Sequence, residues 1–192
     1  MIVKPSADGL ASSLTALPRQ KGPPPVHLWN PPYCGEIDIR IARDGTWFHE
    51  GTPIGRPGLV KLFSSILKKE RDRFFLVTPV EKVGITVEDA PMLAVDFDVE
   101  GKGRDQVLTF YTKTEDQAVA GPRHPIRIDR DKMTGEPSPY ILIRADLEAL
   151  IDRKSFYRLI DLGNHEDRNG SSWFGIWSSG TFFPIIPSAD LT

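Results

Sequence analysis

The chain has 192 residues, of which 40% are hydrophobic, so it is able to bury a core and is not a disordered protein. Its 24 basic and 26 acidic side chains are interspersed and give a net charge of −2, which excludes the basic stripe of a protein that binds nucleic-acid polymers. No apolar run reaches the length of a membrane span and the N-terminus lacks the pattern of a secretory signal, so we expect a cytoplasmic protein with no membrane partner.

Residues 1–35 are predicted to form an extended N-terminal arm. Residues 11–17 are able to make one or two helical turns, and the proline-rich runs at 23–25 and 31–32 then favour extended chain. Apolar residues would hold this arm along the body of the protein; they are Val26, Leu28, Trp29 and Tyr33.

Residues 36–72 are predicted to form an N-terminal strand-helix domain. Isoleucine alternates with polar residues over 37–41, which is the period of a half-buried strand, and the Asp-Gly turn at 44–45 returns the chain as a second strand. From Pro57 onwards, apolar residues recur at the spacing of one helix face, and the predicted helix ends near Glu70.

Residues 73–192 are predicted to form a C-terminal β-barrel-like domain with a helix. Seven short strands are expected, at 74–78, 83–87, 92–99, 107–112, 117–120, 126–128 and 140–144. A second helical unit is expected from Asp146, either with a kink near Ser155 or as two short helices. The apolar tail segments at 173–177 and 182–186 would pack back on the body as strands.

The two predicted helices resemble each other when the sequence is shifted by 88 positions, because Arg56 then aligns with Arg144 and Leu59 with Leu147. One interpretation is coincidence, since amphipathic helices share one pattern. The other is two copies of a strand–strand–helix unit, each too small to bury its helix alone. A ligand pocket would then fit the interface between the copies.

The sequence therefore predicts an α+β fold with two β-rich domains and a repeated strand–strand–helix unit. In the C-terminal part, a run of about seven strands followed by one helix is the element order of a pleckstrin-homology-like barrel closed by its helix. This analogy concerns the order of elements and carries no function.

Several catalytic motifs are absent from the sequence, namely the phosphate loop, the dinucleotide fingerprint and the nucleophile elbow. The single cysteine, Cys34, excludes an intrachain disulfide and a multi-cysteine zinc site. Asp96 and Asp98 alternate on one predicted strand, so their carboxylates share a face and could hold Mg²⁺ together with a third oxygen ligand. The competing interpretation of this pair is an ordinary half-exposed strand.

Arginines at predicted helix starts and turns suit an anionic ligand. Arg56 and Arg144 each precede a predicted helix, where a guanidinium adds to the backbone N–H donors. Arg123 lies beside His124 in a turn rich in glycine and proline. The competing interpretation is that each arginine pairs with a nearby carboxylate on the surface.

Four further residues complete the predicted ligand site. Trp47 or His49 would contact the flat part of a nucleotide-like ligand. Glu88 or Asp89 would accept hydrogen bonds from its base or ribose. Burial in the core is the alternative for Trp47, and a turn is the alternative for Glu88 and Asp89.

Several segments together resemble a bacterial family classified only as a domain of unknown function. They are 44–54 with the helix after it, 75–82, 87–91, 108–110 and 139–140, and the resemblance covers about residues 25–185. It implies a duplicated core, a C-terminal half like a pleckstrin-homology fold, a nucleotide-like ligand between the halves and a role in signal transduction. It offers no catalytic motif to carry over.

We therefore expect a small-ligand-binding signalling protein rather than an enzyme, with no cofactor and no metal. A metal-assisted hydrolase that uses Asp96 and Asp98 is one alternative. A protein–protein interaction domain without a small ligand is the other, in which the N-terminal arm and the apolar tail bind a partner or form a homodimer.

Overall fold

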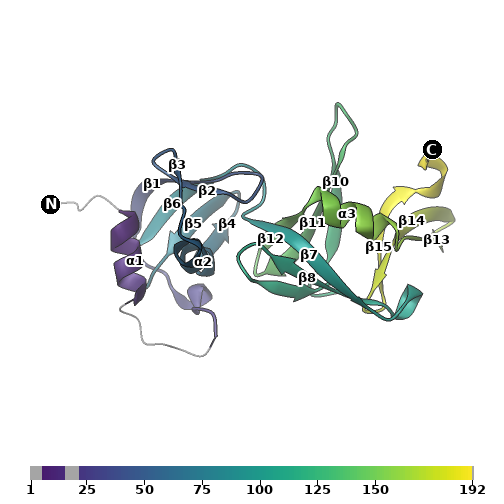
Figure 1. Cartoon of the computed structure of the whole chain (residues 1–192), viewed down its shortest axis with the longest axis horizontal. Coiled ribbons are helices and arrows are strands. Elements are labelled where there is room, and N and C mark those ends of the chain that lie inside the picture. Colours follow the sequence, from purple (N-terminus) through teal and green to yellow (C-terminus); the bar gives the residue numbers. More distant parts are fainter. Residues whose placement is uncertain (1–5, 16–21, 192) are drawn as a thin grey trace. The chain divides into compact units, whose positions relative to one another are not determined.

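The computed structural model describes residues 6–15 and 22–191, and the chain divides into two compact units, Met1–Pro91 and Met92–Thr192 (Figure 1). Each unit contains a six-stranded sheet, and the second unit also has a three-stranded sheet. Both units are β-rich with few helices, which confirms the predicted fold class.

The sheet of the N-terminal unit has the strand order β3-β2-β1-β6-β5-β4. Its strands are β1 (Tyr33–Ile41), β2 (Trp47–His49), β3 (Thr52–Pro53), β4 (Leu67–Glu70), β5 (Arg73–Val77) and β6 (Lys82–Val87). The central strands β1 and β6 are parallel, and every other neighbouring pair is antiparallel. Two three-stranded meanders are therefore joined along β1 and β6.

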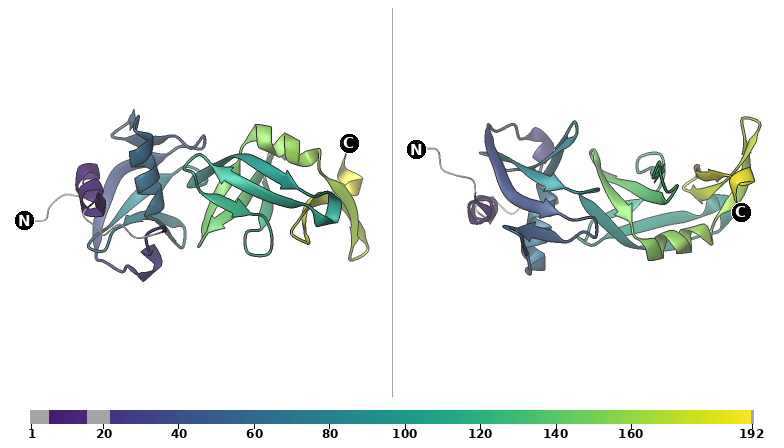
Figure 2. Two further views of the ribbon diagram at one scale, coloured as in Figure 1. Left: turned by 60° about the horizontal axis from the view of Figure 1, so that its bottom comes forward. Right: turned by 90° about the horizontal axis from the view of Figure 1, so that it is seen from above.

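Helix α2 (Pro57–Ser65) connects the two meanders and covers the apolar face of this sheet (Figure 2). Trp47 of β2 is 2% exposed and stacks on Phe63 of α2, with 6.4 Å between the ring centroids. The helix ends at Ser65 rather than near Glu70, because the backbone of Leu67–Glu70 pairs with β5. Pairing within the sheet overrides the helical preference of this lysine-rich segment.

The N-terminal arm is more structured than predicted. It contains α1 (Ala7–Thr15) and the short 3₁₀ helix η1 (Val26–Leu28), and its last residues begin β1. The buried residues Ala7, Leu10 and Leu14 have the spacing of one helix face, and α1 packs beside α2. Residues 16–17 of the predicted helical turn lie outside the described residues.

The large sheet of the C-terminal unit has the strand order β10-β11-β12-β7-β8-β9. Its strands are β7 (Met92–Glu100), β8 (Val107–Thr112), β9 (Gln117–Val119), β10 (Ile126–Arg130), β11 (Pro137–Arg144) and β12 (Leu147–Ile151). A bridge between Gly121 and His124 closes the turn that joins the edge strands β9 and β10, so the sheet curls into a half-barrel.

The two large sheets have the same topology, which confirms a duplicated core. In each one, the first strand of one meander lies parallel to the last strand of the next, as β1 does with β6 and β7 with β12. The connection between the meanders differs: it is α2 in the first unit and the turn at 121–124 in the second. The repeat therefore resides in the sheet.

The second helical unit begins later than predicted. Leu147–Ile151 form the buried strand β12, parallel to β7, and α3 (Arg153–Ile160) follows. Asp152 caps α3 by accepting the N–H of Ser155 at 2.8 Å. The alignment at a shift of 88 was therefore wrong, because it places a residue of α2 on a residue of β12. A run of strands followed by a helix, the predicted pleckstrin-homology-like order, is nevertheless present.

The C-terminal segment forms a three-stranded antiparallel sheet of β13 (Asn164–Arg168), β14 (Ser171–Ser178) and β15 (Thr181–Pro187), with the short 3₁₀ helices η2 (Gly103–Asp105) and η3 (Ser188–Asp190) beside β14. The two apolar tail strands were predicted, whereas the polar strand β13 was not. The domain boundary expected after residue 72 falls inside the first sheet, because β5 and β6 complete that sheet.

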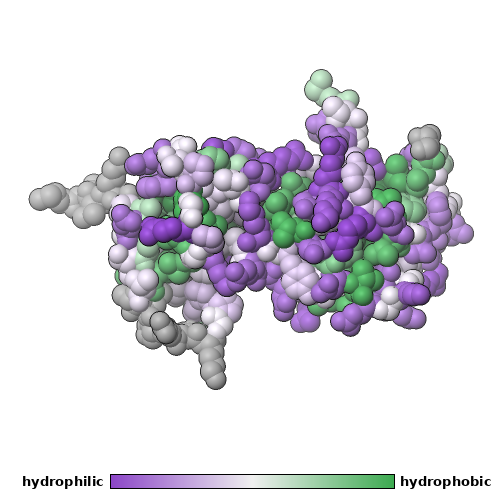
Figure 3. Space-filling view, viewed as in Figure 1, coloured by the Kyte–Doolittle hydropathy of each residue, from purple (hydrophilic) through white to green (hydrophobic). Residues whose placement is uncertain are grey.

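Hydrophobic residues form several areas on the face of the molecule drawn in Figure 3. On the face shown in Figure 3, polar residues separate these areas from one another. The most exposed large hydrophobic side chain is Met133, which is 95% exposed in the loop between β10 and β11. No helix within residues 6–15 and 22–191 is long and apolar enough to cross a membrane.

Candidate functional site

The eight predicted ligand residues fall into both units, five in the first and three in the second, and each is placed within its own unit. Trp47 belongs to the core of the first unit and has no surface to offer a ligand. His49 is half-buried on β2, between Ile39 of β1 and Thr52 of β3. Because Trp47 is buried, its ring is excluded as a stacking platform for a ligand.

Glu88 and Asp89 hold the turn after β1 to the end of β6. Glu88 accepts hydrogen bonds from the Arg40 guanidinium and, at 3.1 Å, from the backbone N–H of Arg43. The Arg43 Nε lies 3.2 Å from Asp89 Oδ2. Both carboxylates therefore bind arginine residues or backbone groups of their own unit, which agrees with the alternative interpretation of a turn.

Two of the three predicted residues of the second unit lie in the turn after β9, and the third is the last residue of β11. Arg123 is exposed in the turn after β9, and the ring Nδ1 of its neighbour His124 lies 3.0 Å from the Leu142 carbonyl oxygen. Arg144 is at the end of β11, not at a helix start, and its Nε donates to Asp116 Oδ1 at 3.1 Å. Arg144 thus binds the turn between β8 and β9, in which Asp116 lies.

Asp96 and Asp98 share the exposed face of β7 as predicted, but both are engaged by other side chains. The Arg158 guanidinium of α3 donates to Asp96 and, together with the N–H of Phe97, lowers the pKa of that carboxyl. Tyr111 donates to Asp98 Oδ2 at 2.7 Å, which raises the pKa of the tyrosine. Among the described residues, no group of three histidines, cysteines or carboxylates is placed to hold a metal ion.

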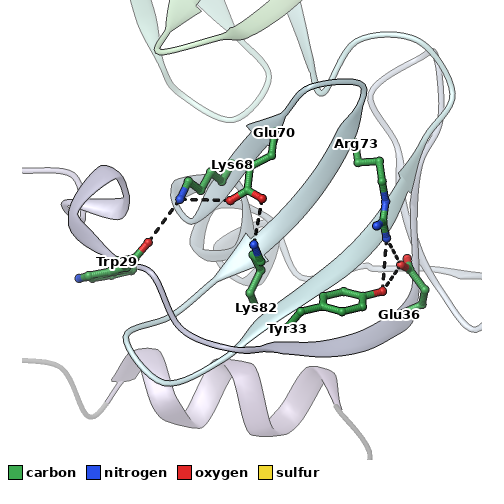
Figure 4. Close-up of polar contacts among 7 residues, drawn as sticks. All are labelled: Trp29, Tyr33, Glu36, Lys68, Glu70, Arg73 and Lys82. Carbon is green, nitrogen blue, oxygen red and sulfur yellow. Dashed lines mark hydrogen bonds and ion pairs between the residues drawn. The ribbon is translucent and has the colours of Figure 1, made fainter.

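The polar face of the first sheet, opposite α2, carries two groups of charged residues (Figure 4). In one, Glu70 lies between two lysines, with 2.9 Å to Lys82 Nζ and 3.3 Å to Lys68 Nζ. The hydrogen bond from Lys82 is the main reason that the pKa of Glu70 is lowered. In the other, Arg73 donates to Glu36 and to the Tyr33 hydroxyl. The charges of this face compensate one another within β4 and across one intervening strand, from β4 to β6 and from β5 to β1.

Arg56 differs from these residues because it forms no ion pair or hydrogen bond through its guanidinium within residues 6–15 and 22–191. It is exposed at the start of α2, which has no side-chain cap. It lines a groove of about 760 Å³ between α1 and α2. The other residues of the lining are Asp8, Ala11, Ser12, Thr15, Gly55, Pro57, Gly58, Leu59 and Leu62.

The apolar stripe of α2 forms the floor of this groove. Phe63 and Ile66 are buried against the sheet, whereas Leu59 and Leu62 remain half-exposed beside α1. A Cβ built at Gly58 would meet no atom within 4 Å, so the backbone at the mouth is open. The groove combines an apolar floor with a cation at its mouth that no residue of 6–15 or 22–191 pairs with, which suits a ligand that has a charged group and an apolar part.

The sequence pointed to Arg56 but missed the wall that α1 contributes. The missed residues of this wall are Asp8, Ser12 and Thr15. A signal was present: Leu10 and Leu14 lie four residues apart, and Ser6 stands where a helix cap is expected. In the structure the Ser6 hydroxyl accepts the N–H of Gly9 at 3.1 Å.

Two family models cover most of the chain. Residues 24–90 match the domain of unknown function DUF1285, N-terminal domain, and residues 91–185 match its C-terminal domain. The chain belongs to the DUF1285 family. The resemblance inferred from the sequence is thus confirmed, and the division between the two DUF1285 domains agrees with that between the two structural units.

Two crystal structures of DUF1285 family proteins from bacteria are similar to this chain. The protein from Silicibacter pomeroyi DSS-3 is 65% identical over 97% of this chain and 99% of its own, with a TM-score of 0.87. The protein from Shewanella baltica OS155 is 29% identical over 66% of this chain and 92% of its own, with a TM-score of 0.52. No protein with a curated description matches the chain.

Proposed function

We propose that the N-terminal unit binds a small anionic ligand in the groove between α1 and α2, with Arg56 as the residue that meets its negative charge. The observation that carries this proposal is an arginine whose guanidinium has no partner among the described residues, at the mouth of a groove with an apolar floor. The groove volume of about 760 Å³ is in the usual range for small-molecule sites.

A comparison of the predicted arginines supports this choice. Arg144 is bound to Asp116, so its charge is already used within the C-terminal unit. Arg123 is exposed in a tight turn and lines none of the groove described above. Arg56 alone of the three combines an uncompensated charge with a concave surface, and a guanidinium binds phosphate or carboxylate through paired N–H donors.

The finer parts of the proposal are a nucleotide-like ligand and a role in signal transduction in the bacterial cytoplasm. Leu59 and Leu62 offer an apolar surface on which a flat base could lie, and Arg56 would meet the phosphate. The alternatives are less well supported, since Asp96 and Asp98 are held by Arg158 and Tyr111, and the described N-terminal arm is docked on its own unit.

Calorimetry and thermal-shift measurements with a panel of nucleoside mono-, di- and triphosphates, cyclic nucleotides and inorganic phosphate test this proposal. Two variants act on the groove in different ways. Arg56→Ala removes the charge. Gly58→Leu fills the mouth, and it keeps or strengthens the helix because leucine is the better helix former by up to about 1 kcal/mol.

We expect Arg56→Ala to weaken binding by about 10- to 100-fold, the range that corresponds to losing one charge-assisted contact, and Gly58→Leu to weaken binding by steric exclusion. Arg123→Ala, an exposed arginine in a turn of the other unit, is the matched control and should leave binding unchanged. Binding that survives both groove variants would refute the site. A panel with no binding member would refute the proposed function.

A further inference from the structure

Asp8 and Arg56 line the same groove but do not form an ion pair. Asp8 lies in the first turn of α1, and within residues 6–15 and 22–191 its carboxylate, like the Arg56 guanidinium, has no hydrogen-bond or ion-pair partner. Two other acids of this unit are paired, Glu36 with Arg73 and Glu70 with two lysines. Two opposite charges therefore face one groove without neutralising each other.

The amphipathic character of α1 explains how Asp8 comes to line the groove. Ala7, Leu10 and Leu14 are buried and hold the helix on the unit. Asp8, Ser12 and Thr15 follow one another at intervals of four and three residues, so they lie along one side of the helix. All three line the groove. Because its buried stripe holds α1 on the unit, the helix presents a carboxylate and two hydroxyl groups to a ligand in the groove.

We propose that the ligand of this groove carries a hydrogen-bond donor, an amine or a hydroxyl group, in addition to its anionic group, and that Asp8 receives this donor. The inference rests on the proposed anion site at Arg56. A groove with a cation, a carboxylate and an apolar floor of Ala11, Leu59 and Leu62 complements a ligand whose anionic and donor groups are joined by an apolar segment. An ionised carboxylate accepts hydrogen bonds and offers none, so it selects donors and repels a second anion.

Arg56 and Asp8 differ in their position relative to the family domain. Arg56 lies within residues 24–90, which match the N-terminal domain of DUF1285, whereas Asp8 precedes them. The anion-binding residue is thus part of the family domain, and the residue that recognises the donor is on a helix outside it. Asp8 is a specificity-determining residue, and its removal should change which ligands are preferred more than whether an anion binds.

Matched pairs of probes separate these roles in the full chain. One pair is 6-aminohexanoate and hexanoate, which differ in a terminal amine. The other is adenosine monophosphate and its 2′,3′-dideoxy form, which differ in the ribose hydroxyls. Calorimetry measures each probe on the unmodified protein, on Asp8→Asn and on Arg56→Ala. Asp38→Asn, at an exposed aspartate outside the groove, is the control for loss of one negative charge.

We expect the unmodified protein to bind the donor-bearing member of at least one pair about tenfold more tightly, the effect of one charge-assisted hydrogen bond. Asp8→Asn should remove this preference and leave the donor-free member unchanged, whereas Arg56→Ala should weaken both members. Equal binding within both pairs, with a loss in Arg56→Ala, would overturn the role of Asp8 and keep the anion site. No binding of any probe to the unmodified protein would overturn both proposals.

Discussion

A single buried hydroxyl, that of Ser178, links the C-terminal three-stranded sheet to the large sheet of the same unit. Its Oγ accepts the backbone N–H of Leu108 at 2.9 Å and donates to the carbonyl of Ala120 at 2.8 Å. Ser178, Leu108 and Ala120 are each fully buried. We predict that Ser178→Ala destabilises this unit strongly, because it leaves one buried donor and one buried acceptor without a partner.

The magnitude follows from the two backbone groups. An unsatisfied buried hydrogen-bonding group costs about 1–3 kcal/mol, so the loss of partners for these two groups should lower the free energy of unfolding by about 2–6 kcal/mol. This is a large share of the ~5–15 kcal/mol that stabilises a typical domain. Ser179→Ala is the matched control, since Ser179 is exposed and only its hydroxyl is removed.

Native-state hydrogen exchange is the appropriate assay, because the two compact units can unfold separately and a single unfolding curve would mix them. The amide of Phe110 in β8 reports on the C-terminal unit, and the amide of Ile39 in β1 serves as the internal control in the other. The exchange of Phe110 should accelerate by roughly 30- to 25,000-fold, the factor equivalent to the predicted loss. A loss below about 0.5 kcal/mol, or one equal to that of Ser179→Ala, would refute the reasoning.

Two further predictions concern single side chains. Asp152→Ala removes the cap of α3 and should lower the stability of the C-terminal unit by about 1 kcal/mol, measured by the same exchange experiment, whereas Asp152→Asn should retain most of it. Burial raises the pKa of Glu81, so its ionised form destabilises the folded state at neutral pH and protonation relieves this. Urea unfolding at pH 7 should therefore show Glu81→Gln to be more stable than the unmodified protein. The difference in the free energy of unfolding should shrink as the pH falls through the range in which glutamate is protonated, and a difference that stays constant with pH would contradict this.

The sequence was informative where a period or a turn signal decides the local structure. The strands predicted from the alternation at 37–41 and from the apolar tail segments are present in the structure. The Asp-Gly turn at 44–45 returns the chain as a second strand, as predicted. It failed where a short apolar run fits either structure: Leu147–Ile151 shares spacing with a helix face, and only the pairing with β7 and β11 makes it a strand. The polar strand β13 left no hydrophobic signal and is defined by its pairing with β14.

The candidate site was predictable only in part, for a related physical reason. Sequence shows which arginines exist, but whether a charge is already paired depends on residues far away in the chain. Arg40 pairs with Glu88 and Arg158 with Asp96, over separations of 48 and 62 residues. Arg144 was predicted as a ligand residue because a helix was expected after it, whereas the structure places the strand β12 there.

The duplicated topology also explains why Arg56 and Arg123 differ. Both lie in the connection between the two meanders of their own sheet, so Arg123, rather than Arg144, is the counterpart of Arg56. In the second unit this connection is a tight turn closed by the bridge between Gly121 and His124. In the first unit it is a nine-residue helix, and α1 packs against that helix to form the groove. The groove thus arises from the part of the duplicated core in which the two copies diverged, so the ligand site proposed at Arg56 is a property of the N-terminal unit and not of the repeat.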